Sequence, residues 1–221
     1  MIMKELHREI VKIFEKYPDV LFGFSNTSFS EYRNQYKCCI VFAVPHSKVL
    51  ALKTYTEESF EALIIDARNT VDHIQDELRL LFDTLKIKFE IPPMAQSSEE
   101  TLIAPFSFKF AAVNAGLGWI GKNDVLVTEK YGPRLRLAAV LVDCDLPFGS
   151  PVTNSRCPVD CLDCVQACPC HALSGNQWSI TSQRSELIDY FLCNKMRSAF
   201  IKTHNRKNSC GLCFVSCPFG L

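Results

Sequence analysis

The sequence predicts an α+β protein in two parts, a mixed helix-and-strand part over residues 1–148 and a cysteine-rich part over residues 149–221. Three observations support this prediction. Before residue 148, segments with helical periodicity alternate with short apolar runs typical of strands. Nine of the twelve cysteines then fall between residues 157 and 217, in two motifs that each end in Cys-Pro. The stretch 146–155, which contains Pro, Gly and Ser, is the expected linker.

Five segments of the first part have a recognisable periodicity. Residues 3–16 and 57–85 repeat apolar side chains at helical spacing, and the longer segment contains no Gly or Pro, so both predict helices. The apolar run 36–45, which ends in proline, predicts a buried strand, and the alternating segment 86–92 predicts another. Residues 107–115 predict a shorter helix.

The segment 124–143 predicts two strands joined by a turn at Tyr131, Gly132 and Pro133, because Gly and Pro favour turns. A hairpin beside helices indicates an α+β layer and not a doubly wound parallel sheet. After residue 157, the one long periodic stretch predicts a helix near 183–200.

Charge and hydropathy exclude several classes of protein. The 24 basic and 24 acidic residues give a formal net charge of zero, so no global charge favours nucleic acid or an acidic membrane surface. Charges are scattered through the first 17 residues, unlike a secretory signal, and the longest apolar runs are too short to span a bilayer. We therefore expect a cytoplasmic protein with no membrane partner and with reduced thiols. Under these conditions twelve cysteines indicate metal ligation more than disulfides.

The cysteine spacing favours iron–sulfur clusters. A zinc site usually has two Cys pairs a dozen or more residues apart, whereas here four cysteines fall within twelve residues. In two-cluster ferredoxins the last Cys of each motif, followed by proline, ligates the neighbouring cluster. This rule predicts two [4Fe–4S] clusters, the first held by Cys157, Cys161, Cys164 and Cys217, and the second by Cys168, Cys193, Cys210 and Cys213.

Four cysteines remain outside this assignment. Cys157 is followed by a three-residue gap where two residues are usual, so Cys170 is the alternative ligand of the first cluster. For Cys38, Cys39 and Cys144 we expect the role of small buried apolar residues.

The stretch "AGLGWIGKN" over residues 115–123 contains Gly116, Gly118 and Gly121 at the spacing of a dinucleotide fingerprint. That fingerprint must follow a strand and open a helix, whereas here a helix is expected before it and a strand after it. Two interpretations remain. The glycines either permit a tight turn, or they allow a flat cofactor to approach the backbone closely.

The stretch "AAVNAGLGWIGKNDVLVTEKYGPRLRLAAVLVDCDLP", followed by "CPVDCLDCVQACP", "CNKM" and "SCGLCFVSCP", resembles the epoxyqueuosine reductase family, and more narrowly its short relatives. That family is also related to reductive dehalogenases. The resemblance is good over about 105–221 and weak over 1–100. It implies a nitroreductase-like α/β domain over 1–148 that binds base-off cobalamin, followed by a double-cluster, ferredoxin-like domain over 149–221.

The resemblance also implies where the cobalamin binds. Trp119 and Ile120 are expected to offer apolar surface to the ring, and Lys122 and Asn123 to donate hydrogen bonds to its amides. The expected cofactor-binding residues are Ser107, Lys109, Gly116, Leu117, Gly118, Trp119, Ile120, Gly121, Lys122 and Asn123. His46 and His73 are the midchain candidates for a cobalt ligand, and neither has a pattern that favours it.

Two departures from the family count against transfer RNA as the substrate. Where the family has a catalytic aspartate, this sequence has Leu102 or Ile103, and the nearest acids are Glu99 and Glu100. We also expect the family's C-terminal helical-repeat domain to be missing, since the sequence stops four residues after Cys217. No proton donor is assigned. The candidates near the glycine stretch are Ser107, Lys109, Lys122 and Tyr131.

The leading hypothesis is an enzyme, a corrinoid-dependent iron–sulfur oxidoreductase. It would pass electrons from a flavodoxin or ferredoxin through both clusters to cobalamin, and on to an unknown small molecule. The alternative is an electron-transfer or corrinoid-reducing protein that serves a partner corrinoid protein and has no substrate of its own. A third hypothesis is a two-cluster ferredoxin without a corrinoid. The basic segment 193–210 balances the negative charge of the clusters, docks an acidic electron donor or contacts RNA phosphates. No pattern of aromatic residues interleaved with its charges supports base stacking.

Overall fold

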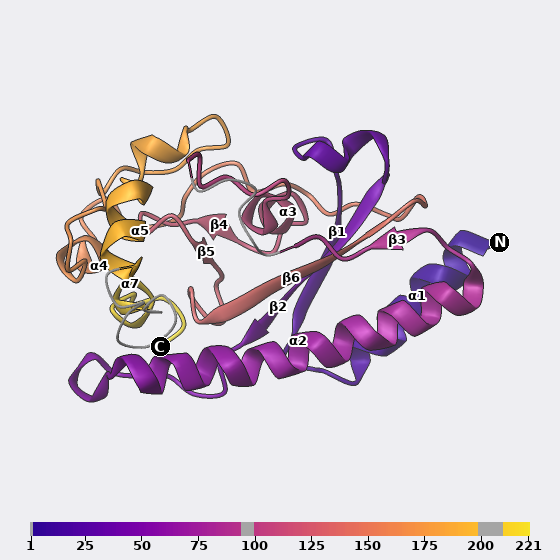
Figure 1. Ribbon diagram of the computed structural model, residues 1–221, viewed down its shortest axis with the longest axis horizontal. Coiled ribbons are helices and arrows are strands. Elements are labelled where there is room, and N and C mark those ends of the chain that lie inside the picture. The colour runs from indigo at the N-terminus through magenta and orange to yellow at the C-terminus, as the bar shows by residue number, and fades with distance from the viewer. Residues whose placement is uncertain (1, 94–99, 199–209) are drawn as a thin grey trace. The chain divides into compact units, whose positions relative to one another are not determined.

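The computed structural model describes residues 2–93, 100–198 and 210–221 (Figure 1). The chain divides into two compact units, each built from separate stretches of sequence. The first unit comprises Met1–Pro45, Ala67–Leu117 and Arg136–Val152. The second comprises His46–Asp66, Gly118–Leu135 and Thr153–Leu221. Both helices and sheets are present, so the predicted α+β class is confirmed, whereas the boundary after residue 148 stays a prediction.

The first unit contains a four-stranded sheet with the strand order β1-β2-β6-β3. The strands are β1 (Leu21–Asn26), β2 (Cys38–Pro45), β6 (Leu135–Val142) and β3 (Phe89–Glu90). β1 runs antiparallel to β2, and β3 runs antiparallel to β6. The central strands β2 and β6 are almost entirely buried, which explains why both read as continuous apolar runs.

Helices α1 (Ile2–Glu15) and α2 (Glu57–Leu85) contribute to one core with one face of this sheet. Along α2 the buried core positions recur every three or four residues, as an amphipathic helix requires, at Ala67, Val71, Ile74, Leu78 and Phe82. The even-numbered residues of β2 enter the same core, because side chains alternate across a strand. Helix α3 (Phe108–Asn114) contacts β1 and β2, and Figure 1 shows it on the side of the sheet opposite α2.

The predicted helices over 3–16, 57–85 and 107–115 and the predicted strand over 36–45 are confirmed as α1, α2, α3 and β2. The alternating segment 86–92 forms only the two-residue strand β3. The strand β1 was not expected, because its sequence is short and contains Gly23. The 3₁₀ turn Glu31–Asn34 follows it, and Ser30 caps that turn by accepting a hydrogen bond from Tyr32.

Of the predicted hairpin over 124–143, the two strands are confirmed, but their pairing with each other is wrong. Strand β5 (Leu126–Val127) pairs antiparallel with β4 (Trp119–Ile120) in a separate two-stranded sheet. Strand β6 instead joins the four-stranded sheet, where it neighbours β2 and pairs with β3 through Leu141 and Val142. The expected turn is reduced to a single bridge between Thr128 and Gly132.

The second unit has short elements around its cysteines. They are η2 (Leu52–Thr54), the start of α2, β4, β5, α4 (Asp163–Gln166), η3 (Arg184–Glu186), α5 (Tyr190–Ser198) and α7 (Leu212–Val215). The helix expected near 183–200 is divided between η3 and α5, and its last two residues lie outside the described residues. Within the described ranges, no helix has the length and apolar character needed to cross a membrane.

Candidate metal centre

Four cysteines of the second unit line one pocket. Cys157, Cys161 and Cys164 come from the segment that leads into and through α4, and Cys217 comes from the residues just after α7. Helices α4 and α7 pack against each other, which brings these two distant segments together. The rest of the lining consists of Lys122, Asn123, Val127, Pro218 and Phe219. These four cysteines are the set that the spacing assigned to the first cluster.

A second group of cysteines lies in the same unit. Cys168 and its partly buried neighbours Cys193 and Cys213 pack in one apolar cluster. Cys210 is close enough to Cys213 for its charge to raise the pKa of the Cys213 thiol. Cys170 belongs to this second group, because its sulfur lies 3.8 Å from that of Cys168. Cys157, in contrast, lines the pocket of the first group.

The environment of these thiols favours the neutral form when no metal is bound. Burial, reinforced by neighbouring cysteines, raises the pKa of Cys164 to about 12. Burial also raises the pKa of Cys217 to about 11, and that of Cys213 well above its ordinary value. Thiolates are the ligand form, so several buried thiols close together are stable as anions only beside a cation. The donor set therefore fits a metal-containing group.

The placement of the metal-ligating side chains bears on the kind of metal group that they could hold. No three His, Cys, Asp or Glu side chains among the described residues surround a point that could hold one ion. A four-iron cluster has a different requirement, because each cysteine binds a different iron atom and the sulfurs stand apart around the cluster. Four cysteines that line one pocket fit a cluster of this kind.

The three glycines of the stretch 115–123 each have a packing reason within their own unit. Gly116 has a φ of +79°, and an added Cβ would lie 2.8 Å from the carbonyl oxygen of Ser150. A Cβ on Gly118 would lie 2.2 Å from the carbonyl oxygen of Val127, on the paired strand. A Cβ on Gly121 would lie 2.7 Å from Val127 and 3.5 Å from the sulfur of Cys157. The backbone around Gly121 therefore borders the pocket.

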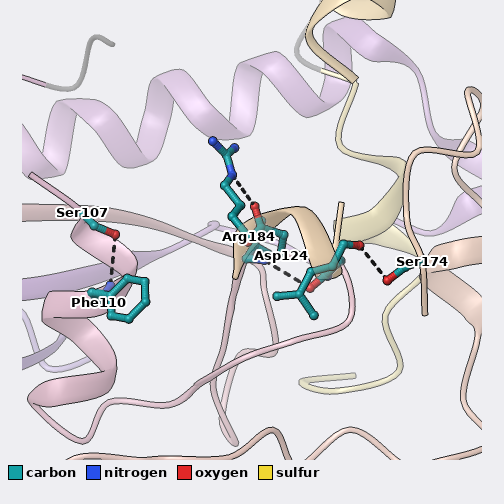
Figure 2. Close-up of polar contacts among 8 residues, drawn as sticks. Ser107, Phe110, Asp124, Ser174 and Arg184 are labelled. Atoms are coloured by element: carbon teal, nitrogen blue, oxygen red, sulfur yellow. Dashed lines mark hydrogen bonds and ion pairs between the residues drawn. The ribbon is translucent and has the colours of Figure 1, made fainter. Parts of the chain in front are cut away.

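The expected cobalamin-binding residues are distributed over both units. Ser107 caps α3 by accepting a hydrogen bond from the backbone N–H of Phe110 (3.3 Å; Figure 2), and Lys109 is half-buried on the same helix. These two residues, Gly116 and Leu117 belong to the first unit, and residues 118–123 belong to the second. Trp119 and Ile120 lie in β4 with exposed fractions of 0% and 2%, so protein covers their apolar surface.

Lys122 and Asn123 form hydrogen bonds with the cysteine segments. The Lys122 ammonium donates to the backbone oxygens of Val159 (2.8 Å) and Cys161 (3.0 Å). The Asn123 amide donates to the backbone oxygen of Cys213 (3.1 Å). Both side chains are buried, at 2% and 3% exposure. They thus link the end of the glycine stretch to both cysteine groups.

Two further residues were missed from the sequence. Arg134 is buried, and its guanidinium donates to the backbone oxygens of Val215 (3.3 Å), Cys217 (2.6 Å) and Phe219 (2.5 Å). Burial lowers the pKa of Arg134, and the nearby Cys217 opposes that shift. Asp124 has a φ of +55° and accepts a hydrogen bond from Arg184 (Figure 2). An Asn-Asp pair signals a turn, but no local pattern identifies partners so far along the chain.

The other candidates were the histidines considered as cobalt ligands and the residues near the position of the family's aspartate. The ring of His46 packs against Phe60 at 5.6 Å, and His73 is exposed on α2. Leu102, at one of the positions expected for an acid, is buried with a φ of +53°, and its neighbour Ile103 is exposed. Glu99 and residues 199–209 of the basic segment lie outside the described residues.

Comparison with curated proteins confirms the resemblance. The chain is 35% identical to the epoxyqueuosine reductase of Listeria monocytogenes over 112 residues, which cover 49% of this chain and 28% of the relative. It is also 35% identical to that of Cellulophaga algicola, over 52% of this chain and 38% of the relative. A tetrachloroethene reductive dehalogenase of Desulfitobacterium hafniense is 42% identical over 66 residues, 28% of this chain and 12% of the relative. Each match thus spans less than half of the relative. A comparison with protein-family models finds no match.

Solved structures share the fold. A selenomethionine-labelled epoxyqueuosine reductase matches with a TM-score of 0.60 and 17% identity, covering 99% of this chain and 66% of that one. A catabolic reductive dehalogenase in complex with 3-bromo-4-hydroxybenzoic acid matches with a TM-score of 0.62 and 15% identity, covering 91% of this chain and 30% of that one. At these identities the likeness establishes the fold alone.

Proposed function

We propose that this chain is a corrinoid-dependent iron–sulfur reductase that acts on a small molecule. The observation that carries the proposal is the pocket lined by Cys157, Cys161, Cys164 and Cys217, with the other group of cysteines in the same unit. The similarity to epoxyqueuosine reductases and to reductive dehalogenases adds the expectation of a corrinoid. Electrons would come from a low-potential donor such as flavodoxin or ferredoxin.

We assign two [4Fe–4S] clusters to eight cysteines. The first takes Cys157, Cys161, Cys164 and Cys217, and the second takes Cys168, Cys193, Cys210 and Cys213. The lining of the pocket supports the first set, and the mutual proximity of the second group supports the other. Cys170 is left as a neighbour of Cys168 and not as a ligand. When bound, such clusters accept and release single electrons at low potential.

The chain's own residues hold and shield these clusters. The hydrogen bonds from Lys122, Asn123 and Arg134 fix the backbone of the cysteine segments, so that the sulfurs are preorganised. Phe219 and Val127 line the pocket with apolar surface and exclude water from it. We further propose that base-off cobalamin binds against the α/β region of residues 1–148, along the stretch from Ser107 and Lys109 to Asn123.

Transfer RNA is not the substrate that we propose. Leu102 and Ile103 are apolar, so neither can replace the aspartate of the epoxyqueuosine reductases. We therefore expect little or no reduction of epoxyqueuosine in transfer RNA. Turnover at the rate of an authentic epoxyqueuosine reductase, measured by mass spectrometry of the nucleosides, would refute this expectation.

The test of the main proposal begins with anaerobic purification and cluster reconstitution. We expect about eight iron atoms and about eight sulfides per chain, because eight cysteines match two four-iron clusters. Cobalamin is then added in excess, and its visible spectrum and its co-elution with the protein are recorded. Intact clusters with no spectral change and no co-elution would refute the corrinoid proposal and leave a two-cluster electron carrier.

The missing aspartate favours one alternative, a corrinoid-reducing protein that has no substrate of its own. The two proposals differ in a turnover assay. The alternative predicts that the cluster-loaded protein reduces cobalamin, free or on a partner corrinoid protein, while no epoxide or halogenated small molecule is consumed. Consumption of such a molecule at a rate that depends on both clusters and cobalamin would support the enzyme.

A further inference from the structure

Lys122 is a buried cation in the wall of the cysteine pocket. Its side chain lines the pocket together with Cys157, Cys161, Cys164 and Cys217, and the residue is only 2% exposed. The preceding residue, Gly121, lies so close to Cys157 that an added Cβ would come 3.5 Å from its sulfur. The backbone just before Lys122 thus also borders the first cysteine group.

The charge of Lys122 has no acidic partner among the residues that the structure describes. Its ammonium group donates to two neutral backbone oxygens, those of Val159 and Cys161, and it forms no ion pair with a described carboxylate. A buried ammonium group is costly unless an anion compensates for it. The four cysteines that line the pocket with Lys122 would supply this compensation, because they become thiolates when they bind metal.

We propose that Lys122 is a positioning residue for the first cluster, which holds the turn at Val159–Cys161 and raises the reduction potential of that cluster through its buried charge. This inference rests on the proposed function, because it requires the four cysteines to hold a cluster. It adds a role that the sequence did not suggest, since Lys122 was expected to contact a corrinoid or to donate a proton.

The effect on the potential follows from electrostatics. Reduction adds one electron, and therefore one negative charge, to the cluster. A fixed positive charge beside the cluster stabilises the reduced form more than the oxidised form, and a water-poor interior strengthens the interaction. The two hydrogen bonds keep the ammonium group in place, so this stabilisation needs no rearrangement when the electron arrives.

The same hydrogen bonds give Lys122 a structural role that can be measured separately. Val159 is 85% exposed, so few packing contacts hold the turn that it forms with Cys161. The Lys122 ammonium is therefore a principal restraint on the backbone of this turn. Without it, the sulfur of Cys161 would be less well placed to bind iron.

The test compares Lys122→Met, Lys122→Gln and Lys122→Arg with a control, Arg156→Gln. Methionine removes the charge and the donors, glutamine removes the charge but keeps an N–H donor, and arginine keeps both. Arg156 is also a cation beside Cys157 in sequence, but its side chain is 58% exposed. Water and salt therefore screen its charge, and its removal should change the potential little.

The readout is a redox titration of the cluster-loaded protein, followed by electron paramagnetic resonance without any substrate or corrinoid. In the Lys122→Met and Lys122→Gln variants, one of the two clusters should need a lower potential for reduction. At a fixed potential its ratio of reduced to oxidised form should fall about tenfold, which is 59 mV for one electron. In the same variants, the ratio of reduced to oxidised form of the other cluster should change less than about twofold. In Lys122→Arg and in the control, this ratio should change less than about twofold for both clusters.

Each outcome decides a different point. A wild-type chain that binds no iron–sulfur cluster would refute the proposed function itself. Full iron content in Lys122→Met and Lys122→Gln with unchanged potentials, or an equal shift in the Arg156→Gln control, would overturn the inference about Lys122. If both uncharged variants fail to bind the first cluster, the potential of that cluster cannot be compared, and the iron content of Lys122→Arg tests the inference instead. Retention of iron by Lys122→Arg supports the positioning role, and its loss there as well overturns the inference.

Discussion

The Nε of Arg184 lies 3.1 Å from a carboxylate oxygen of Asp124, whose side chain is only 7% exposed (Figure 2). The guanidinium of the same arginine lies over the ring of Tyr190, 4.5 Å from its centroid. Tyr190 begins helix α5, which carries Cys193. One ion pair therefore connects the end of the glycine stretch with the helix that supplies a proposed ligand of the second cluster.

Replacing Arg184 with alanine should destabilise the second unit. The substitution removes the ion-pair partner of a buried carboxylate and a cation–π contact, and we expect a loss of about 1–2 kcal/mol in the free energy of unfolding. Urea denaturation of the cluster-free wild type and variant measures this loss. In the control, Lys12→Ala, the ion pair with Glu9 is exposed on both sides, so the change should stay below about 0.5 kcal/mol. Equal losses in the two variants would contradict the role of burial.

Replacing Arg134 with lysine should cost the protein its first cluster. Lysine keeps the charge but cannot reproduce the planar fork that reaches the carbonyls of Val215, Cys217 and Phe219. We expect iron to fall from about eight towards about four atoms per chain, because Cys217 loses its backbone support. Arg79→Lys, on the exposed surface of α2, is the control and should bind as much iron as the wild type. Full iron content in Arg134→Lys would show that Cys217 is held by other contacts.

Replacing Gly118 with alanine should destabilise the fold itself. The new Cβ would lie 2.2 Å from the carbonyl oxygen of Val127, so β4 and β5 would have to separate. We expect the melting temperature to fall by several degrees, corresponding to about 1–3 kcal/mol. Circular dichroism of the cluster-free protein is the measurement. An unchanged melting temperature together with loss of cobalamin binding would instead favour the interpretation of Gly118 as a cofactor contact.

The buried thiol of Cys39 should make stability depend on alkaline pH. Burial raises its pKa from 9.0 to about 12, although a hydrogen bond with Ser25 acts in the opposite direction. Because the pKa is higher in the folded state than in the unfolded state, the protonated Cys39 thiol contributes fully to the free energy of unfolding below pH 9. This contribution is lost as the pH rises towards 12. The unfolding free energy of cluster-loaded protein should therefore fall less steeply over this range in Cys39→Ala than in the wild type. Identical slopes would contradict the prediction. Native Cys39 should also resist alkylation by iodoacetamide.

Four features could be predicted from the sequence because each depends on neighbours in the chain. The spacing of the two Cys-Pro motifs indicated iron–sulfur chemistry, since a metal-binding loop must place its cysteines within a few residues of one another. The absence of Gly and Pro over 57–85 indicated α2, and the apolar run over 36–45 indicated β2. Burial of Cys38 and Cys39 followed from their place in that strand.

Other features depended on contacts between residues far apart in the sequence. The partner of β5 is β4, whereas β6 joins a separate sheet between β2 and β3. The roles of Lys122 and Arg134 depend on carbonyl groups about 40 and 80 residues further along the chain, to which they donate hydrogen bonds. A backbone carbonyl has the same chemistry at every residue, so no sequence pattern marks it as a partner. Only the folding that brings Cys161 and Cys217 into one pocket decides which carbonyls these buried cations meet.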